Sequence, residues 1–174
     1  MLSYVVERAA HRLRSHGADA ASLEVHVRYV DTRTRIERQT ADEAEDPGGS
    51  AALARRRALP APTDSTDELW HHAQSLFAEI PRRRALTKTI GVTLLDLRPR
   101  AGWQGRLFSD PIGDRAGDRA GSRADRQRAL DRALDRLRAK HGFGRCLRGT
   151  SFPLVATTEL GPDGFRLRTP SLNQ

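Results

Sequence analysis

Few residues in this chain are arranged to catalyse a reaction. Two-metal catalysis needs paired carboxylates on a rigid framework, but Asp96 is the one acid on a confidently predicted core strand and has no acidic partner nearby. The dense acids of residues 42–46 precede a Pro-Gly-Gly run that is typical of a loop. The adjacent pair His71-His72 would point in different directions on a helix, and Ser151 has no base at a recognisable spacing. The sequence therefore predicts no catalytic site, no metal site and no cofactor.

Arginine dominates the charge of the chain. Its 30 Lys and Arg residues, of which all but Lys88 and Lys140 are arginine, outnumber 22 Asp and Glu and give a formal net charge of +8. This balance favours a polyanionic partner, nucleic acid first, although many arginines alternate with aspartates on what the pattern indicates are solvated helix faces. The single cysteine, Cys146, and the absence of a signal peptide or an apolar run of about 20 residues indicate a cytoplasmic protein without a membrane partner.

A short peptide motif, Gln104-Gly105-Arg106-Leu107-Phe108, follows a strand-like run and precedes a low-complexity segment. The amide of Gln104 suits a small polar pocket, and Leu107 and Phe108 suit an apolar cleft, which is the arrangement of a peptide that docks on a sliding clamp. The alternative is that the apolar pair anchors a loop to its own core.

The periodicity predicts the elements that position these residues. An amphipathic helix over residues 2–16 is followed by a strand over 22–31, whose alternation points Leu23, Val25, Val27 and Tyr29 to one side. Residues 32–40 suit a second strand or hairpin arm, 41–50 a loop, and 51–59 an edge strand that ends at Pro60.

A second helix begins after Ser65, which forms a capping box with Glu68, and ends at Pro81. A strand over 86–97 follows. This order of elements predicts an α+β fold, an antiparallel sheet with two helices on one face, one strand short of a β-α-β-β-α-β module. The open face of the sheet would carry His26, Arg28, the triplet Arg55, Arg56 and Arg57, and Lys88.

The remainder of the chain is predicted to be a tail. The repeat GDRA-GDRA-GSRA over residues 113–124 is typical of a flexible linker, and a helix over 123–141 carries a narrow apolar stripe of Leu130, Leu134 and Leu137. A turn at 161–164 predicts a hairpin. We therefore expect a domain over residues 1–99, a peptide and linker over 100–122, and a tail over 123–174.

Taken together, the chain resembles the C-terminal part of Y-family (DinB/UmuC-type) translesion DNA polymerases, that is, their little finger domain and tail. The colinear order of six moderately specific stretches carries the resemblance. They are VVERAAHRLRSHG, SLEVHVRYVD, RRRALPAPTDSTDEL, TIGVTLLDL, QGRLF and RALDRALDRLRAKHGFGRCLRGTS.

The resemblance implies DNA binding without catalysis. A little finger grips the phosphates of primer-template DNA with its open sheet, and the motif after its last strand docks on the β sliding clamp through Gln104, Leu107 and Phe108. The residues implied in DNA contact are His26, Arg28, Arg55, Arg56, Arg57, Lys88 and Thr89. The palm, fingers and thumb and the first little-finger strand have no counterpart in these residues, so Mg²⁺ would belong to the palm and a separately encoded catalytic portion is a third expected partner.

The chain departs from the family pattern at two positions and in one loop: Gly105 stands where an apolar residue is usual, and Ala58 where threonine is frequent. Residues 32–50 resemble an insertion loop in the little finger DNA-binding domain that the resemblance implies over residues 1–99. The alternative interpretation of the whole chain is a small arginine-rich α+β interaction or RNA-binding protein with no connection to polymerases. In that case the Leu107-Phe108 pair would be buried in the protein's own core.

Overall fold

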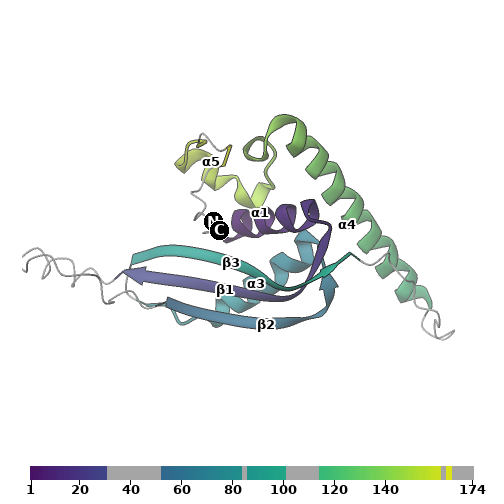
Figure 1. The fold of residues 1–174 in the computed structure, drawn as a ribbon, viewed down its shortest axis with the longest axis horizontal. Helices are drawn as coiled ribbons and strands as arrows, with labels where there is room; N and C mark the ends of the chain where they lie inside the picture. Colours follow the sequence, from purple (N-terminus) through teal and green to yellow (C-terminus); the bar gives the residue numbers. More distant parts are fainter. Residues whose placement is uncertain (31–51, 84–85, 101–113, 162–163, 166–174) are drawn as a thin grey trace, which may run out of the picture.

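The computed structural model describes residues 1–30, 52–83, 86–100, 114–161 and 164–165 (Figure 1). The predicted second strand or hairpin arm at 32–40, the loop at 41–50 and the peptide at 104–108 lie outside these residues.

A three-stranded antiparallel sheet forms the base of the molecule. Its strands are β1 (Ala18–Val30), β2 (Ala52–Thr63) and β3 (Leu86–Pro99), in the order β2-β1-β3. The side chains of Leu23, Val25 and Val27 in the central strand are at most 1% exposed, which confirms the predicted alternation. Strand β2 is an edge strand, as predicted, and continues through Pro60 to Thr63, because a proline at an edge need not interrupt a ladder of hydrogen bonds.

Two helices cover one face of this sheet. Helix α1 (Leu2–Ser15) and helix α3 (Thr66–Glu79) bury Leu13, Leu69 and Leu76 in a single core with the apolar side of the strands. The Ser65 side chain accepts a hydrogen bond from the Glu68 backbone N–H at 3.5 Å, as expected of a helix N-cap. The sheet with its helices on one face confirms the predicted α+β class.

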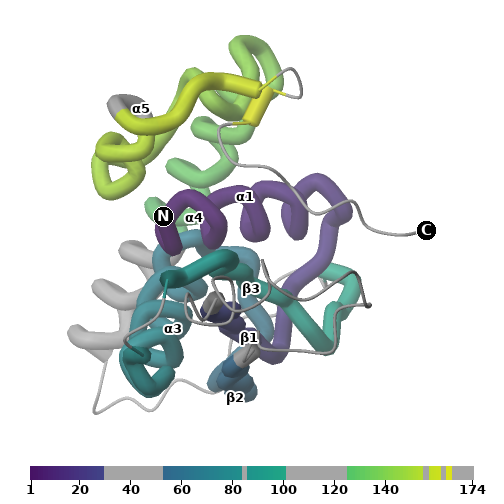
Figure 2. Tube along the Cα trace, turned by 90° about the vertical axis from the view of Figure 1, so that its left-hand side faces the viewer, coloured from purple at the N-terminus to yellow at the C-terminus, as the bar shows by residue number. Residues whose placement is uncertain are grey.

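The tail folds back over α1. It consists of α4 (Asp114–His141), the short 3₁₀ helices η2 (Phe143–Arg145) and η3 (Gly149–Ser151), and α5 (Pro153–Thr157). Tyr4 of α1, which is fully buried, forms a second apolar cluster with Phe143 and Leu154. Figure 2 shows α1 lying between this tail, in green to yellow, and the sheet with α3. Helix α1 is therefore covered on two sides.

Two expectations for the tail need correction. The backbone of residues 114–122, predicted to belong to a flexible linker, is helical and continuous with the rest of α4. Alanine and arginine favour helices strongly, and each glycine of the repeat costs only about 1 kcal/mol in a helix interior. At the other end, Gly161 and Phe165 close a turn through a backbone hydrogen bond of 2.7 Å, but the described residues beside it form no strand pair.

Helix α4 also packs through a different face from the one expected, about 100° further round the helix. Leu130 and Leu137 of the predicted apolar stripe are 50% and 47% exposed, whereas Asp131 and Arg138 are 2% and 3% exposed. The reason lies on α1, whose outer side presents charged side chains to the tail, so that complementary charges are buried in preference to leucines.

Candidate nucleic-acid interface

The register of the sheet decides which side chains lie on its open face. Residues directly opposite one another in an antiparallel pair project to the same side. Arg56 is opposite Glu24, and Ala54 is opposite His26. Because these β1 residues alternate with the core residues Leu23 and Val25, they point away from the helices.

Arg55 and Arg57 belong to the other side of the sheet, contrary to the prediction. They are opposite Val25 and Leu23, which face the helices. The guanidinium of Arg57 donates to Ser75 Oγ at 3.2 Å and to the Glu79 carboxylate, both on α3. Three consecutive arginines cannot share one face of a strand, because successive side chains alternate. Of the triplet, Arg56 alone lies on the open face.

On the far side of β1, strand β3 contributes Thr89 and Gly91 to the open face. Thr89 is opposite the exposed Arg28, and Gly91 is opposite His26. A Cβ atom at Gly91 would collide with the imidazole of His26, so the absence of a side chain lets the ring lie across β3. Lys88 is the extra residue where the register shifts between Arg28 and Tyr29, which is the position of a β-bulge.

The other end of the open face holds an ion pair that spans the sheet. Arg56 Nη2 on β2 donates to Asp96 Oδ2 on β3 at 2.8 Å, and Ser22 on the intervening strand donates to the same oxygen. The Ser22 hydrogen bond, then the Arg56 hydrogen bond, lower the pKa of Asp96. Asp96 has a positive φ of 52°. Since its carboxylate neutralises Arg56, the arginine of this face that has no ion pair within the described residues is Arg28, at the end next to the bulge residue Lys88.

A second group of charged residues, not foreseen from the sequence, joins α1 to the tail. Arg138 Nη2 donates to Glu7 Oε2 at 2.6 Å, and both side chains are at most 2% exposed. Ser151 Oγ donates to the other carboxylate oxygen of Glu7 at 3.2 Å, and Arg138 Nε donates to the Cys146 carbonyl at 2.9 Å. The buried pair is thus supplied with further hydrogen bonds, as a buried charge requires.

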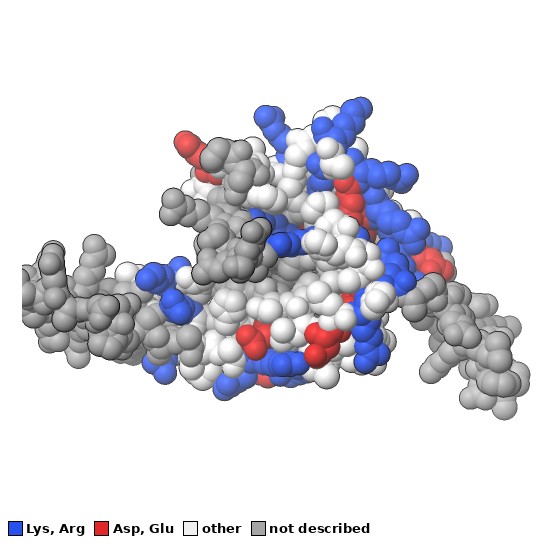
Figure 3. All heavy atoms as spheres, in the orientation of Figure 1, with Lys and Arg blue, Asp and Glu red and all other residues white. Residues whose placement is uncertain are grey.

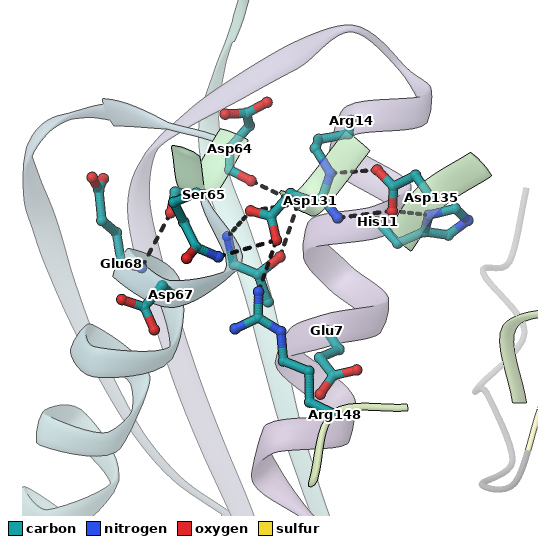
Figure 4. A network of polar contacts seen from close by, with 12 residues as sticks. Glu7, His11, Arg14, Asp64, Ser65, Asp67, Glu68, Asp131, Asp135 and Arg148 are labelled. Atoms are coloured by element: carbon teal, nitrogen blue, oxygen red, sulfur yellow. Dashed lines mark hydrogen bonds and ion pairs between the residues drawn. The ribbon is translucent and has the colours of Figure 1, made fainter. Parts of the chain in front are cut away.

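Next to this pair, Arg14 of α1 connects three elements (Figure 4). Its Nε and Nη2 donate to the two oxygens of Asp135 at 2.6 and 2.9 Å, and its Nη1 donates to the Asp64 carbonyl at 2.8 Å. His11 Nδ1 lies 2.9 Å from Asp135 Oδ1. Burial would raise the pKa of Asp135, but the hydrogen bonds from Arg14 and His11 outweigh burial and hold that pKa well below its usual range.

Asp131 links α4 to the start of α3 through a hydrogen bond. Its Oδ2 accepts from the Thr66 backbone N–H at 3.1 Å, and its Oδ1 accepts from Arg148 Nη2 at 2.7 Å (Figure 4). A carboxylate at a helix N-terminus satisfies a free amide and interacts favourably with the helix dipole. The one sequence signal for this network was the recurrence of Asp at 131 and 135, a helical spacing that we had assigned to a solvated face.

The predicted clamp-binding residues Gln104, Leu107 and Phe108 lie outside the described residues. Within those residues, no helix is long and apolar enough to cross a membrane, and no three His, Cys, Asp or Glu side chains are grouped as ligands of one metal ion.

Comparisons with known proteins identify the family. Residues 1–107 match the model of the impB/mucB/samB family C-terminal domain. One relative, a DNA polymerase IV of Desulfatibacillum aliphaticivorans, is 28% identical over 109 residues, a match that covers 62% of this chain and 23% of the relative. The interpretation without any polymerase connection is therefore wrong. The chain belongs to the impB/mucB/samB family and carries the C-terminal domain of a Y-family DNA polymerase.

Proposed function

We propose that the chain binds primer-template DNA through the open face of its sheet and serves translesion synthesis in the tolerance of DNA damage. One observation carries this proposal: both helices of the domain cover the same side of the sheet, and no described helix covers the other side of β1, β2 and β3. Arg28 and Thr89 lie at one end of that surface, next to the bulge residue Lys88. Cations and hydroxyls of this kind contact phosphates, which any base sequence offers alike.

The small side chains of this face support the same proposal. Ala54 and Ala58 of β2 and Gly91 of β3 leave the backbone of the sheet close to whatever lies on it. The imidazole of His26 lies flat over Gly91 and is half-buried. A phosphate backbone can then approach Arg28 and Thr89 without displacing a large side chain.

A pair of single substitutions tests the choice of face. Arg28→Ala and Arg57→Ala each remove one exposed arginine from a strand, but Arg57 lies on the helix side and bonds Glu79. Binding of a labelled primer-template duplex is measured by fluorescence anisotropy over a range of salt. Arg28→Ala is expected to lower the slope of log Kobs against log salt by about 0.9, the contribution of one phosphate contact, and Arg57→Ala to leave it unchanged. Equal slopes for both variants would contradict the proposed face.

We also propose that residues 104–108 dock on the β sliding clamp. The support is the sequence motif and its position just after β3, the last strand of the family domain. Calorimetric titration with the clamp should lose its signal in Leu107→Ala with Phe108→Ala and keep it in the control Arg106→Ala, which changes a residue between the expected anchors. Unchanged binding by the double variant would reject the docking peptide and leave the DNA proposal intact.

A last part of the proposal assigns polymerisation, with its Mg²⁺ ions, to a catalytic portion outside these 174 residues. The support is that the relative is a DNA polymerase, of which the matched residues make up 23%. The purified chain is expected to bind DNA but not to extend a primer when nucleotides and Mg²⁺ are supplied. Primer extension by the chain alone would overturn this assignment.

A further inference from the structure

A groove away from the sheet face lies between α1, α4 and the residue that follows β3. Its volume is about 530 Å³, within the range of roughly 300–1,000 Å³ for ligand pockets. Among the described residues its lining includes four arginines and a histidine but a single carboxylate. The lining residues are His11, Arg14, Ser15, Arg100, Ala129, Arg132, Asp135 and Arg136.

The carboxylate of this groove does not offset the arginines that face solvent. Both oxygens of Asp135 accept hydrogen bonds from Arg14, and Oδ1 also contacts His11. Asp131, one turn away, is buried and bonds Thr66 and Arg148. Asp131 and Asp135 are thus turned toward the domain, so they do not neutralise Arg132 and Arg136 on the outer side of α4.

These arginines form a regular row. Arg128, Arg132, Arg136 and Lys140 recur every four residues and therefore follow one ridge of α4, over roughly 18 Å. Arg128 contacts Asp125 at 3.3 Å, whereas Arg132 and Arg136 are exposed and have no hydrogen bond or ion pair within the described part of the chain. Figure 3 shows Lys and Arg side chains gathered over α4.

We propose that this groove and the ridge beside it bind the phosphates of a nucleic-acid strand, at a second site separate from the sheet. Among the described residues, the lining contains no Trp, Tyr or Phe on which a base could stack, so the contacts are made to the backbone and not to bases. The length of the ridge exceeds what one phosphate group needs, which favours a polymer over a small anion. Bound there, a strand would lie along α4 on the tail side of α1.

The test uses the full 174-residue chain and a labelled single-stranded oligonucleotide. Arg132→Ala with Arg136→Ala removes two cations that have no partner among the described residues. The matched control, Arg126→Ala with Arg145→Ala, removes the same charge from exposed positions outside the groove. Anisotropy titrations should show the salt slope of the groove variant reduced by about 1.4, at about 0.7 per phosphate contact for a single strand, with the control unchanged. Circular dichroism of both variants should match the parent chain.

Several results distinguish binding at this site from binding at the sheet and from a non-specific effect of net charge. If the groove variant and the control weaken binding equally, net charge explains the effect and the proposal fails. If inorganic phosphate displaces the oligonucleotide at an equal concentration of phosphate groups, the groove is a small-anion site and the polymer proposal also fails. If Arg28→Ala leaves binding of the primer-template duplex unchanged while the groove variant weakens binding of the single strand, the proposed function of the sheet is rejected and this second site stands.

Discussion

Removal of the buried arginine of the α1–tail interface should undock the tail while the sheet stays folded. Arg138→Met keeps an unbranched apolar side chain over the Phe143 ring, where the Arg138 guanidinium carbon now lies 4.4 Å from the ring centroid. It leaves the 1% exposed Glu7 with only the Ser151 hydroxyl as a partner among the contacts described above. Breaking a buried pair from one side costs about 3–5 kcal/mol. The sheet core contains no tail residue, so this cost should fall on docking of the tail.

Hydrogen exchange measured by mass spectrometry resolves the two parts of the molecule. A loss of 3–5 kcal/mol corresponds to an acceleration of roughly 100- to 5,000-fold, up to the rate of unprotected amides, and we expect it in peptides covering residues 125–141. Peptides covering β1 should keep their protection. The control is Arg136→Met, two residues away on the exposed side of α4, which should exchange like the parent chain.

Two results would refute this reasoning. Unchanged exchange over residues 125–141 in Arg138→Met would show that the Glu7–Arg138 pair does not hold the tail. Equal acceleration in β1 and α4 would show that the tail and the sheet unfold as one unit. Glu7→Leu combined with Arg138→Met should restore part of the protection, because an apolar pair of similar volume often replaces a buried ion pair at little cost.

Three further predictions follow from single sites. Because the pKa of Asp135 is lower in the folded protein, its contribution to tail docking should be fully present above the unfolded pKa of about 3.9 and lost as pH falls below it. Pepsin cleavage of the tail over a pH series should show this loss. Asp135→Asn should remove that part of the pH dependence. Gly91→Ala should destabilise the domain by about 1–3 kcal/mol, because its methyl group would collide with His26. In urea unfolding, His26→Ala in the same chain should recover most of this loss. No recovery would show that the strain lies elsewhere. Leu137→Ala should change the free energy of unfolding, measured in urea, by less than about 0.5 kcal/mol because the side chain is 47% exposed. Leu76→Ala should lower it by about 2–5 kcal/mol because Leu76 is 1% exposed. Similar losses in the two variants would mean that the leucine stripe is buried after all.

The elements that could be predicted from the sequence are those with a local pattern of residue types. The alternation at Leu23, Val25 and Val27 indicated β1, and the capping box at Ser65 located the start of α3 within one residue. Each of these signals needs only the neighbours of a residue within its own element. The same holds for the colinear stretches that resembled the little finger, a resemblance that the family match confirms for the stretches within residues 1–107.

The candidate site was less predictable, because it depends on pairing between strands. Arg55, Arg56 and Arg57 looked equivalent in the sequence, yet the register with β1 assigns only the middle one to the open face. A shift of one residue in that register would have reversed the assignment. Neutralisation of Arg56 by Asp96 likewise joins positions 40 residues apart, which no local pattern contains.

The sequence by itself determined the periods of the helices and strands, the family, and a strong positive charge. Only the tertiary structure decided which of the positively charged side chains stay exposed to solvent. In the sequence of helix α4, Asp residues are interspersed among Arg residues. In the structure, Glu7 and Arg14 of α1 pair with Arg138, Asp131 and Asp135, which turn inward and leave Arg132 and Arg136 facing solvent. The physical reason is that a buried charge needs a partner, and the partner here lies more than 100 residues away in the chain.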